Sequence, residues 1–309
     1  FLATLVAALQ ADLEADGVYC GYQFVDETNN PLLQVENRPV PSADLCTALL
    51  DGNFFVPESI FLRRHVYKDV GFFDEALRAC EDWDVWLRAA KKYRIIHSPH
   101  ILTRHRVLAG SMSTDPLRML TARLAVLKKH VGEEPSSAGT STVHRAYGRA
   151  YLGSCVEYLQ YGHPDRAYEC FQKMAKICPS TLLEVDTYYQ LGCGDQPKGQ
   201  MGDLASLNVK RNSVPLLGMM DRLFADPSTS DEIRHLQRAA RARMFHSLGL
   251  LAYGTREFDQ SRRFFGRAVQ NDSRLLFDPA LLSRGVKSLL GPRLFEQLKN
   301  LRRRTDSAG

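Results

Sequence analysis

The pattern of apolar residues changes near residue 116, and this change constrains the fold more than any other feature of the sequence. Residues 16–98 alternate short β-branched and aromatic runs with amphipathic stretches, a pattern typical of an α/β layer fold. From residue 116 onward, the apolar residues recur at helical spacing. The sequence therefore predicts an α/β region followed by an all-α region. It contains no apolar run of about 18 residues that would predict a membrane-spanning helix.

Local patterns predict several elements of the α/β region. We expect helices over residues 1–15, 64–69 and 81–92, and strands over residues 17–25 and 93–97, with Pro99 ending the second strand. We expect residues 31–41 to form a polar connection. The stretch 81–92 is the most informative, because Trp83 and Trp86 share one apolar face while Glu81 and Asp82 begin the helix. Carboxylates in a first turn complement the helix dipole.

The second part of the chain is expected to be helical throughout. Thr229 and Glu232 fit a capping box, with Thr229 as the N-cap of a helix that continues past Leu248. Small and aromatic residues around 162–179 and 254–272 weakly resemble tetratricopeptide hairpins. The predicted organisation is an α/β domain over residues 1–115, a linker helix and loop over residues 116–145, and a helical domain over residues 146–309.

Cysteine usage and charge indicate the compartment and exclude some partners. The seven cysteines form no Cys-x-x-Cys pair, which predicts reduced thiols in a cytoplasmic protein. Residues 1–115 carry 16 acidic and 11 basic residues, whereas the remainder carries 19 acidic and 29 basic residues. The later basic residues form a solvated surface, or alternatively a surface for an anionic membrane or an acidic glycan. They are Arg234, Arg238, Arg241, Arg243, Lys299, Arg302, Arg303 and Arg304. We expect no nucleic-acid partner, since no recognition motif accompanies them.

Five motifs in residues 53–113 occur in an order and at spacings that resemble a known enzyme family. They are Asn53, the pair Arg63-Arg64, the turn 70–75 (Val-Gly-Phe-Phe-Asp-Glu), the block 81–88 (Glu-Asp-Trp-Asp-Val-Trp-Leu-Arg) and the segment 104–113. This arrangement resembles the C-terminal half of the catalytic domain of family 2 glycosyltransferases, which have the GT-A fold. Residues 1–30 resemble the helix and strand that follow the metal-binding Asp-x-Asp segment of this family. The resemblance thus implies that residues 1–115 are the acceptor-side half of such a domain.

The resemblance implies a chemistry and a set of site residues. It implies inverting transfer from a nucleotide-diphosphate sugar to a glycan or lipid-linked acceptor in cell-surface polysaccharide synthesis, with Mg²⁺ or Mn²⁺ as cofactor. By the motif, Asp82 is the general base, and Glu81 orients Asp82 or the acceptor. Asn53, Trp83, Asp74 and Arg106 are the candidate substrate-binding residues. The customary histidine of the segment that follows is replaced by Leu108.

The donor and metal half of the family's domain has no counterpart in the sequence. Asp12 and Glu14, like Asp82 and Asp84, are two residues apart, but neither pair lies at a strand end, where the family places its Asp-x-Asp motif. The first residue is Phe1, and we expect the sequence to begin partway through a longer protein. The isolated chain is accordingly expected to be inactive, and it offers no metal ligands of its own.

Each candidate also has a structural interpretation. Spacing alone favours Glu81 and Asp82 as helix caps, with the dipole lowering the Asp82 pKa. Trp83 is either a sugar platform or a core residue, and Trp86 is a core residue. Asp74 is either a cap or an acceptor contact, and Arg106 binds the diphosphate or is a surface residue. At the level of the whole chain, the alternative is a helical protein-interaction module carrying a non-catalytic remnant. A sugar-binding remnant is a third possibility.

Overall fold

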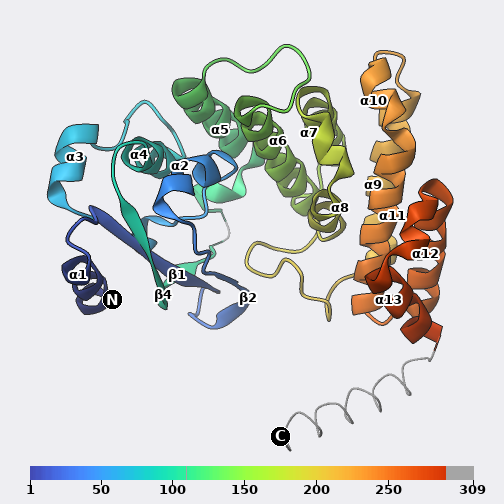
Figure 1. Ribbon diagram of the computed structural model, residues 1–309, viewed down its shortest axis with the longest axis horizontal. Coiled ribbons are helices and arrows are strands. Elements are labelled where there is room, and N and C mark those ends of the chain that lie inside the picture. Colours follow the sequence, from blue (N-terminus) through green and yellow to red (C-terminus); the bar gives the residue numbers. More distant parts are fainter. Residues whose placement is uncertain (109, 290–309) are drawn as a thin grey trace, which may run out of the picture. The chain divides into compact units, whose positions relative to one another are not determined.

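The computed structural model describes residues 1–108 and 110–289, which form two compact units. The first unit contains residues 1–178 together with residues 197–201. The second contains residues 179–196 and residues 202–289. The predicted α/β region is found at the start of the first unit, and helices follow it (Figure 1). The basic residues from Lys299 to Arg304 lie outside the described residues.

A small mixed sheet forms the centre of the α/β region. Its strands are β1 (Gly17–Val25), β2 (Pro31–Glu36), β3 (Ile60–Leu62) and β4 (Ile95–Arg106). The central strand β1 pairs in parallel with β4 along its whole length. It pairs antiparallel with β3 near its start and with β2 toward its end. β1 is buried at most positions because it is covered on both faces, which explains its nearly continuous apolar sequence.

Two strands differ from the sequence-based prediction. Pro31–Glu36 was expected to be a connection but is the strand β2. Its residues alternate between exposed and half-buried, so it lacks the continuous apolar run that predicts a buried strand. Pro99 was expected to end a strand, and this prediction is wrong, since β4 continues to Arg106. The register passes from Cys20–Ser98 to Gly21–Ile101, so Pro99 and its neighbour are left out of the pairing. A bulge of this kind accommodates proline, which has no N–H to donate.

Helices cover both faces of the sheet (Figure 1). On one face, α1 (Leu2–Ala11) packs Leu5 and Leu9 against Val18 and Cys20 of β1. On the other lie α2 (Ser42–Leu50) and α4 (Glu81–Ala90), with α3 (Arg64–Val70) between them in the chain. The helix predicted from the tryptophan-bearing block is therefore confirmed.

Three longer helices complete the first unit, namely α5 (Pro116–Val131), α6 (Thr142–Gln160) and α7 (Pro164–Ile177). α6 and α7 form the helical hairpin that the pattern around Gly162 predicted, and the structure groups this hairpin with the α/β region. Arg123 of α5 holds Glu157 of α6 through two hydrogen bonds, of 2.5 and 2.7 Å. The tetratricopeptide assignment itself stays a prediction.

The second unit is built from α8 (Val185–Gly192), α9 (Val209–Ala225), α10 (Asp231–His235), α11 (Gln237–Gly254), α12 (Phe258–Asn271) and α13 (Pro279–Leu289). The predicted cap is wrong by one residue. Ser230 caps α10, whereas the Thr229 hydroxyl donates to the Leu223 carbonyl at 2.6 Å. None of the described helices has the length and apolarity that crossing a bilayer requires.

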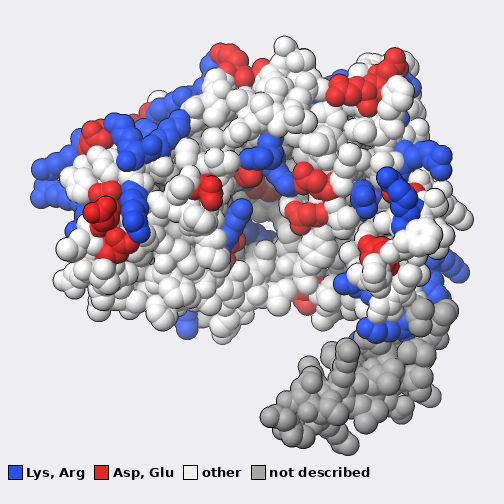
Figure 2. All heavy atoms as spheres, viewed as in Figure 1, with Lys and Arg blue, Asp and Glu red and all other residues white. Residues whose placement is uncertain are grey.

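Charge on the first unit is mixed. Figure 2 shows Lys and Arg side chains gathered over α3 and the end of α4, with Asp and Glu side chains beside them. Lys92 pairs with Asp69 at 3.0 Å, and Lys91 binds His130 at the end of α5. These charges neutralise one another locally, as expected of a solvated protein surface.

Candidate active site

The site is built at the start of α4. Cys80 adopts a left-handed conformation with φ of 59°, which turns the chain into the helix and puts Glu81 and Asp82 in its first turn. Asp82 Oδ1 accepts the Trp83 N–H at 2.7 Å, and Oδ2 accepts from Asn53 Nδ2 at 3.2 Å. Asn53 is itself oriented, since its Oδ1 accepts the Phe55 N–H at 3.1 Å. The structure thus brings together two residues predicted to share a site, Asn53 and Asp82.

Burial governs the ionisation of Asp82. Desolvation raises the pKa of Asp82, and the Glu81 carboxylate adds to the rise. The hydrogen bonds from the Trp83 N–H and from Asn53 act in the opposite direction but are outweighed. The expectation of a lowered pKa is therefore wrong, because the dipole effect is smaller than the cost of withdrawing the carboxylate from water. Asp82 remains partly exposed, so a ligand can reach it.

Further acidic and aromatic side chains surround Tyr22, a residue on which the charge of Asp82 acts. Tyr22 of β1 is buried and lies opposite Glu36 of β2 in the strand register. His105 of β4 lies 6.0 Å from the Tyr22 ring, centroid to centroid, and its Nδ1 is 2.8 Å from Glu58 Oε1. Burial raises the pKa of Tyr22, and the carboxylates of Glu36, Glu58 and Asp82 raise it further. The phenol therefore lies within the electrostatic field of three carboxylates.

These neighbours carry no signal in the local sequence. Tyr22 looked like any aromatic residue of a buried strand, and Glu36 lay in a stretch predicted to be a loop. Lys198, from the segment that returns to the first unit, also acts electrostatically near Asp82. No local pattern marks these residues, since strand register pairs Tyr22 with Glu36 and long-range folding brings Lys198 into the field of Asp82.

Trp83 is a core residue. Its side chain is 3% exposed, and its indole N–H donates to the Leu49 carbonyl of α2 at 2.8 Å. The candidate role as a platform for a sugar ring is thus contradicted, because the ring faces the protein interior. Trp86 is buried as predicted.

Trp83→Phe is expected to lower the free energy of unfolding by roughly 1 kcal/mol, mainly by removing the hydrogen bond to Leu49. Denaturant unfolding measures this loss. Binding of any sugar ligand should be unchanged in the variant, and a large selective loss of such binding would restore the platform role.

No hydrogen bond or ion pair joins Asp74 or Arg106 to Asp82 within the described residues. Asp74 accepts from Lys129 Nζ at 2.7 Å and caps the Ala76 N–H at 3.0 Å. Lys129 also reaches Asp84, which lies roughly 200° around α4 from Asp82. Arg106 is exposed and follows His105 on β4, so strand alternation turns it away from the Tyr22 ring. The structure therefore does not join these two predicted residues to the site.

Asp84 is the centre of a separate buried network. Its carboxylate is fully buried and accepts from Arg88 Nε at 3.0 Å, Lys129 Nζ at 3.1 Å and His130 Nε2 at 2.8 Å. Lys91 Nζ lies 3.1 Å from His130 Nδ1. An ammonium group can only donate, so His130 is neutral and carries its proton on Nε2. This network fastens α4 to α5.

The described residues do not fit a divalent metal. They contain no group of three or more His, Cys, Asp or Glu side chains placed to hold one. Asp82 and Asp84 point to different sides of α4, and Asp84 is saturated by its three donors. Asp12, from the other predicted acidic pair, binds Arg94 at 2.6 Å. The Mg²⁺ or Mn²⁺ that the resemblance implies therefore has no site among the described residues.

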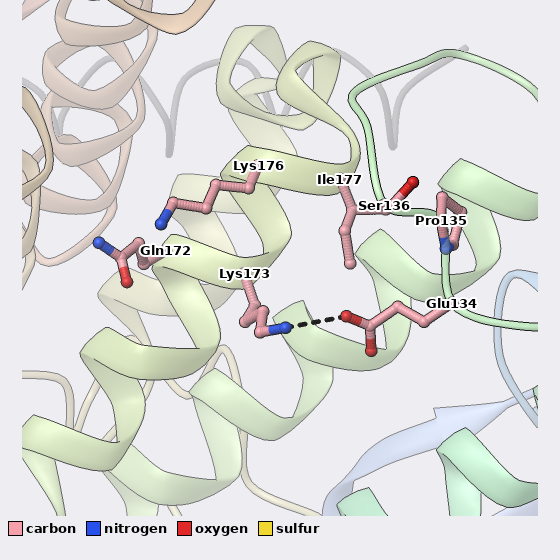
Figure 3. Close-up of a pocket in the computed structure, with 7 residues that line it drawn as sticks. All are labelled: Glu134, Pro135, Ser136, Gln172, Lys173, Lys176 and Ile177. Atoms are coloured by element: carbon pink, nitrogen blue, oxygen red, sulfur yellow. Dashed lines mark hydrogen bonds and ion pairs between the residues drawn. The ribbon is translucent and has the colours of Figure 1, made fainter. Parts of the chain in front are cut away.

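A pocket of about 270 Å³ lies elsewhere in the first unit (Figure 3). It is formed by the loop after α5 and by α7, and its lining includes Lys176. Lys173 spans it to reach Glu134, with a Nζ–Oε1 distance of 2.9 Å. Neither Asp82 nor Asn53 lines this pocket.

Comparison with known proteins points to one family. Residues 2–133 match the family model described as Glycosyltransferase like family 2. Uncharacterized glycosyltransferases of Rickettsia prowazekii (strain Madrid E) and Rickettsia typhi (strain ATCC VR-144 / Wilmington) are each 25% identical to this chain over 111 residues. Each match covers 33% of this chain and 33% of the relative, so the chain spans about a third of the length of these curated relatives. No solved structure matches the chain.

Proposed function

We propose that residues 2–133, which form a family 2 glycosyltransferase-like region, supply the acceptor side of a sugar-transfer site in which Asp82 is the general base. The proposal rests on the hydrogen bonding, burial and accessibility of the Asp82 carboxylate. Its carboxylate is held by Asn53, is withdrawn from water and is still reachable. A purely structural helix cap would gain from a lowered pKa, whereas a raised pKa makes a carboxylate a stronger base.

The chemistry that follows is a single displacement. Asp82 takes the proton of an acceptor hydroxyl while that oxygen forms a bond to the anomeric carbon of the donor sugar. The bond from the anomeric carbon to the diphosphate oxygen breaks at the same time, and the nucleoside diphosphate leaves with the electron pair. Attack from the side opposite the leaving group inverts the anomeric centre. The donor is thus a nucleotide-diphosphate sugar, and the acceptor is a glycan or a lipid-linked saccharide.

Two neighbours of Asp82 tune this step. Asn53 donates to Oδ2 and so fixes the plane of the carboxylate. It leaves other lone pairs of Asp82 available for the acceptor hydroxyl. Glu81 has no hydrogen-bond or ion-pair partner within the described residues, and its negative charge raises the pKa of Asp82. Glu81 therefore strengthens the base without competing for the proton at the same position.

The proposal predicts opposite pH shifts for two substitutions. The general base must be deprotonated, so kcat/KM should fall as the pH drops through the Asp82 pKa, above the usual aspartate value of about 3.9. Asn53→Ala removes a donor to the charged form, so this fall should move to higher pH. Glu81→Gln removes a like charge, so the fall should move to lower pH. Acceptor-dependent release of nucleoside diphosphate by the product of the complete gene measures both profiles.

The same assay separates the proposal from its alternative. Release that depends on acceptor and responds to both substitutions supports general-base transfer, and parallel assays with Mg²⁺ and Mn²⁺ test the metal requirement. Absence of any acceptor-dependent release across a panel of nucleotide sugars would favour a helical interaction module with a non-catalytic remnant.

A further inference from the structure

The segment Pro197–Met201, called the strap below, packs against the α/β region although the residues on both sides of it belong to the second unit. The Gly199 carbonyl accepts the Gln34 N–H of β2 at 2.9 Å. A turn closes the strap, since the Gln200 N–H donates to the Pro197 carbonyl at 2.9 Å. The strap thereby satisfies a backbone donor at the edge of the sheet.

Gly199 allows the strap to lie this close to the sheet. Its φ is +86°, which side chains rarely permit. A Cβ at this position would stand 2.6 Å from Leu32 Cδ1 and 3.2 Å from Phe24 Cβ. The backbone geometry therefore fixes the position of the preceding residue, Lys198, beside the strand β2.

Lys198 is half-buried and uncompensated. It has no hydrogen bond or ion pair within the described residues, yet the charges of Glu157, Arg123 and Asp82 act on it. Burial lowers the pKa of Lys198, Glu157 and Asp82 oppose this, and Arg123 reinforces it. Glu157 cannot neutralise the ammonium fully, because both of its oxygens already accept from Arg123. A cation held in this way costs stability unless a ligand pairs with it.

We propose that Lys198 binds a phosphate oxygen of the substrate at the Asp82 site. An ammonium group with three unused donors can bind an anion. In sugar transfer from a nucleotide-diphosphate sugar, the donor's phosphate oxygens are such anionic groups. This identification of the substrate rests on the proposed function. Lys198 comes from residues beyond the 2–133 match, so the strap completes a site that the family-like region begins.

Two sources present the same phosphate chemistry. One is the diphosphate of the donor, where Lys198 would stabilise the charge that develops as the sugar leaves. The other is the phosphate of a lipid-linked acceptor, where Lys198 would position the acceptor hydroxyl. Both place the anion within reach of the base, and kinetics tell them apart.

Binding of inorganic pyrophosphate to this chain, measured by calorimetry, tests the phosphate site directly. Lys198→Met keeps the length of the side chain but removes the charge, and it should weaken binding by roughly tenfold or more. Lys198→Arg keeps a positive charge and should retain most of the affinity. Lys176→Met is the matched control, because Lys176 is an exposed lysine of the same unit on the pocket of Figure 3. Circular dichroism confirms that each variant is folded.

Gly199→Ala gives a second, independent variant that keeps Lys198 itself. It strains the backbone and pushes the strap from the sheet, so pyrophosphate affinity should again fall. Unchanged affinity in Lys198→Met, or a loss in Lys176→Met instead, would overturn the assignment. So would a wild-type chain that binds no pyrophosphate at millimolar concentration.

Transfer kinetics with the product of the complete gene then identify the source. If Lys198→Met raises KM for the nucleotide sugar or lowers kcat with every acceptor, Lys198 binds the donor diphosphate. If it raises KM only for phosphate-bearing acceptors, Lys198 binds the acceptor. A protein that binds pyrophosphate through Lys198 but transfers no sugar would refute the proposed function and still support the phosphate site. If Lys198→Met transfers sugar normally with both classes of acceptor, the role of Lys198 is refuted and the proposed function of Asp82 still stands.

Discussion

Asp82→Asn is expected to abolish sugar transfer, lowering kcat/KM by about 10²- to 10⁴-fold, the usual contribution of a general base. The substitution keeps the shape of the side chain and one acceptor oxygen for Asn53, but an amide cannot take a proton at pH 7. Binding of the nucleotide sugar should be nearly unchanged, because Asp82 is proposed to contact the acceptor. Acceptor-dependent product formation and donor titration measure the two effects separately.

Stability provides the control for this variant. An aspartate whose pKa is raised by folding binds its proton more tightly in the folded state, so its ionisation weakens the fold as the pH rises past the unfolded value. Asp82→Asn removes that cost, and the protein should be as stable as wild type, or more so, at neutral pH. A variant that is fully stable and still transfers sugar at the wild-type rate would remove Asp82 from its proposed role.

Asp84→Asn, only two residues further along α4, should have the opposite effect. The fully buried Asp84 carboxylate accepts from Arg88, Lys129 and His130. An amide leaves these donors without their negative partner, and the free energy of unfolding should fall by about 3–5 kcal/mol, the usual cost of breaking a buried ion pair. Urea unfolding at pH 7 measures the loss. Asp74→Asn, which touches the same lysine from a partly exposed position, should cost much less.

The contribution of Asp84 depends on pH with a definite sign. Burial would raise the pKa of Asp84, but hydrogen bonds from His130, Lys129 and Arg88 outweigh it and lower the pKa. The stabilisation is therefore complete above the unfolded aspartate pKa, and it is lost as the pH falls through the lower folded value. The difference in stability between wild type and Asp84→Asn should shrink on acidification below about pH 4. A difference that stays constant from pH 7 to pH 3 would contradict this account.

Local patterns predicted those elements whose sequence matches one regular period. The strand β1 and the helix α4 are apolar on the faces that they bury, and both occur where the sequence predicted them. The strand β2 and the second half of β4 were not predicted, because their pairing depends on the register with β1 and on a bulge at Pro99. Such features depend on a partner strand, which no local window contains.

The candidate site was predicted in part for the same reason. Asn53 and Asp82 followed from the spacing of the family motifs, and they are hydrogen-bonded in the structure. Trp83 was ambiguous because an amphipathic helix does not reveal what its apolar face meets. Tyr22 and Lys198 were missed, since neither belongs to a motif and only long-range folding brings them into the electrostatic field of Asp82. The direction of the Asp82 pKa shift required knowledge of burial, which sequence spacing does not give.

The route of the chain through the strap limits how this protein can be divided. Residues 179–196 and those from residue 202 onward belong to one unit, and the five residues between them pack with the other unit. A truncation after Cys178, or a chimaera that exchanges everything downstream, would therefore strip β2 of an edge hydrogen bond and discard Lys198. Recombination between relatives would need to keep the helical unit with its own family 2 glycosyltransferase-like region, so the two are expected to be inherited together instead of being shuffled as interchangeable modules.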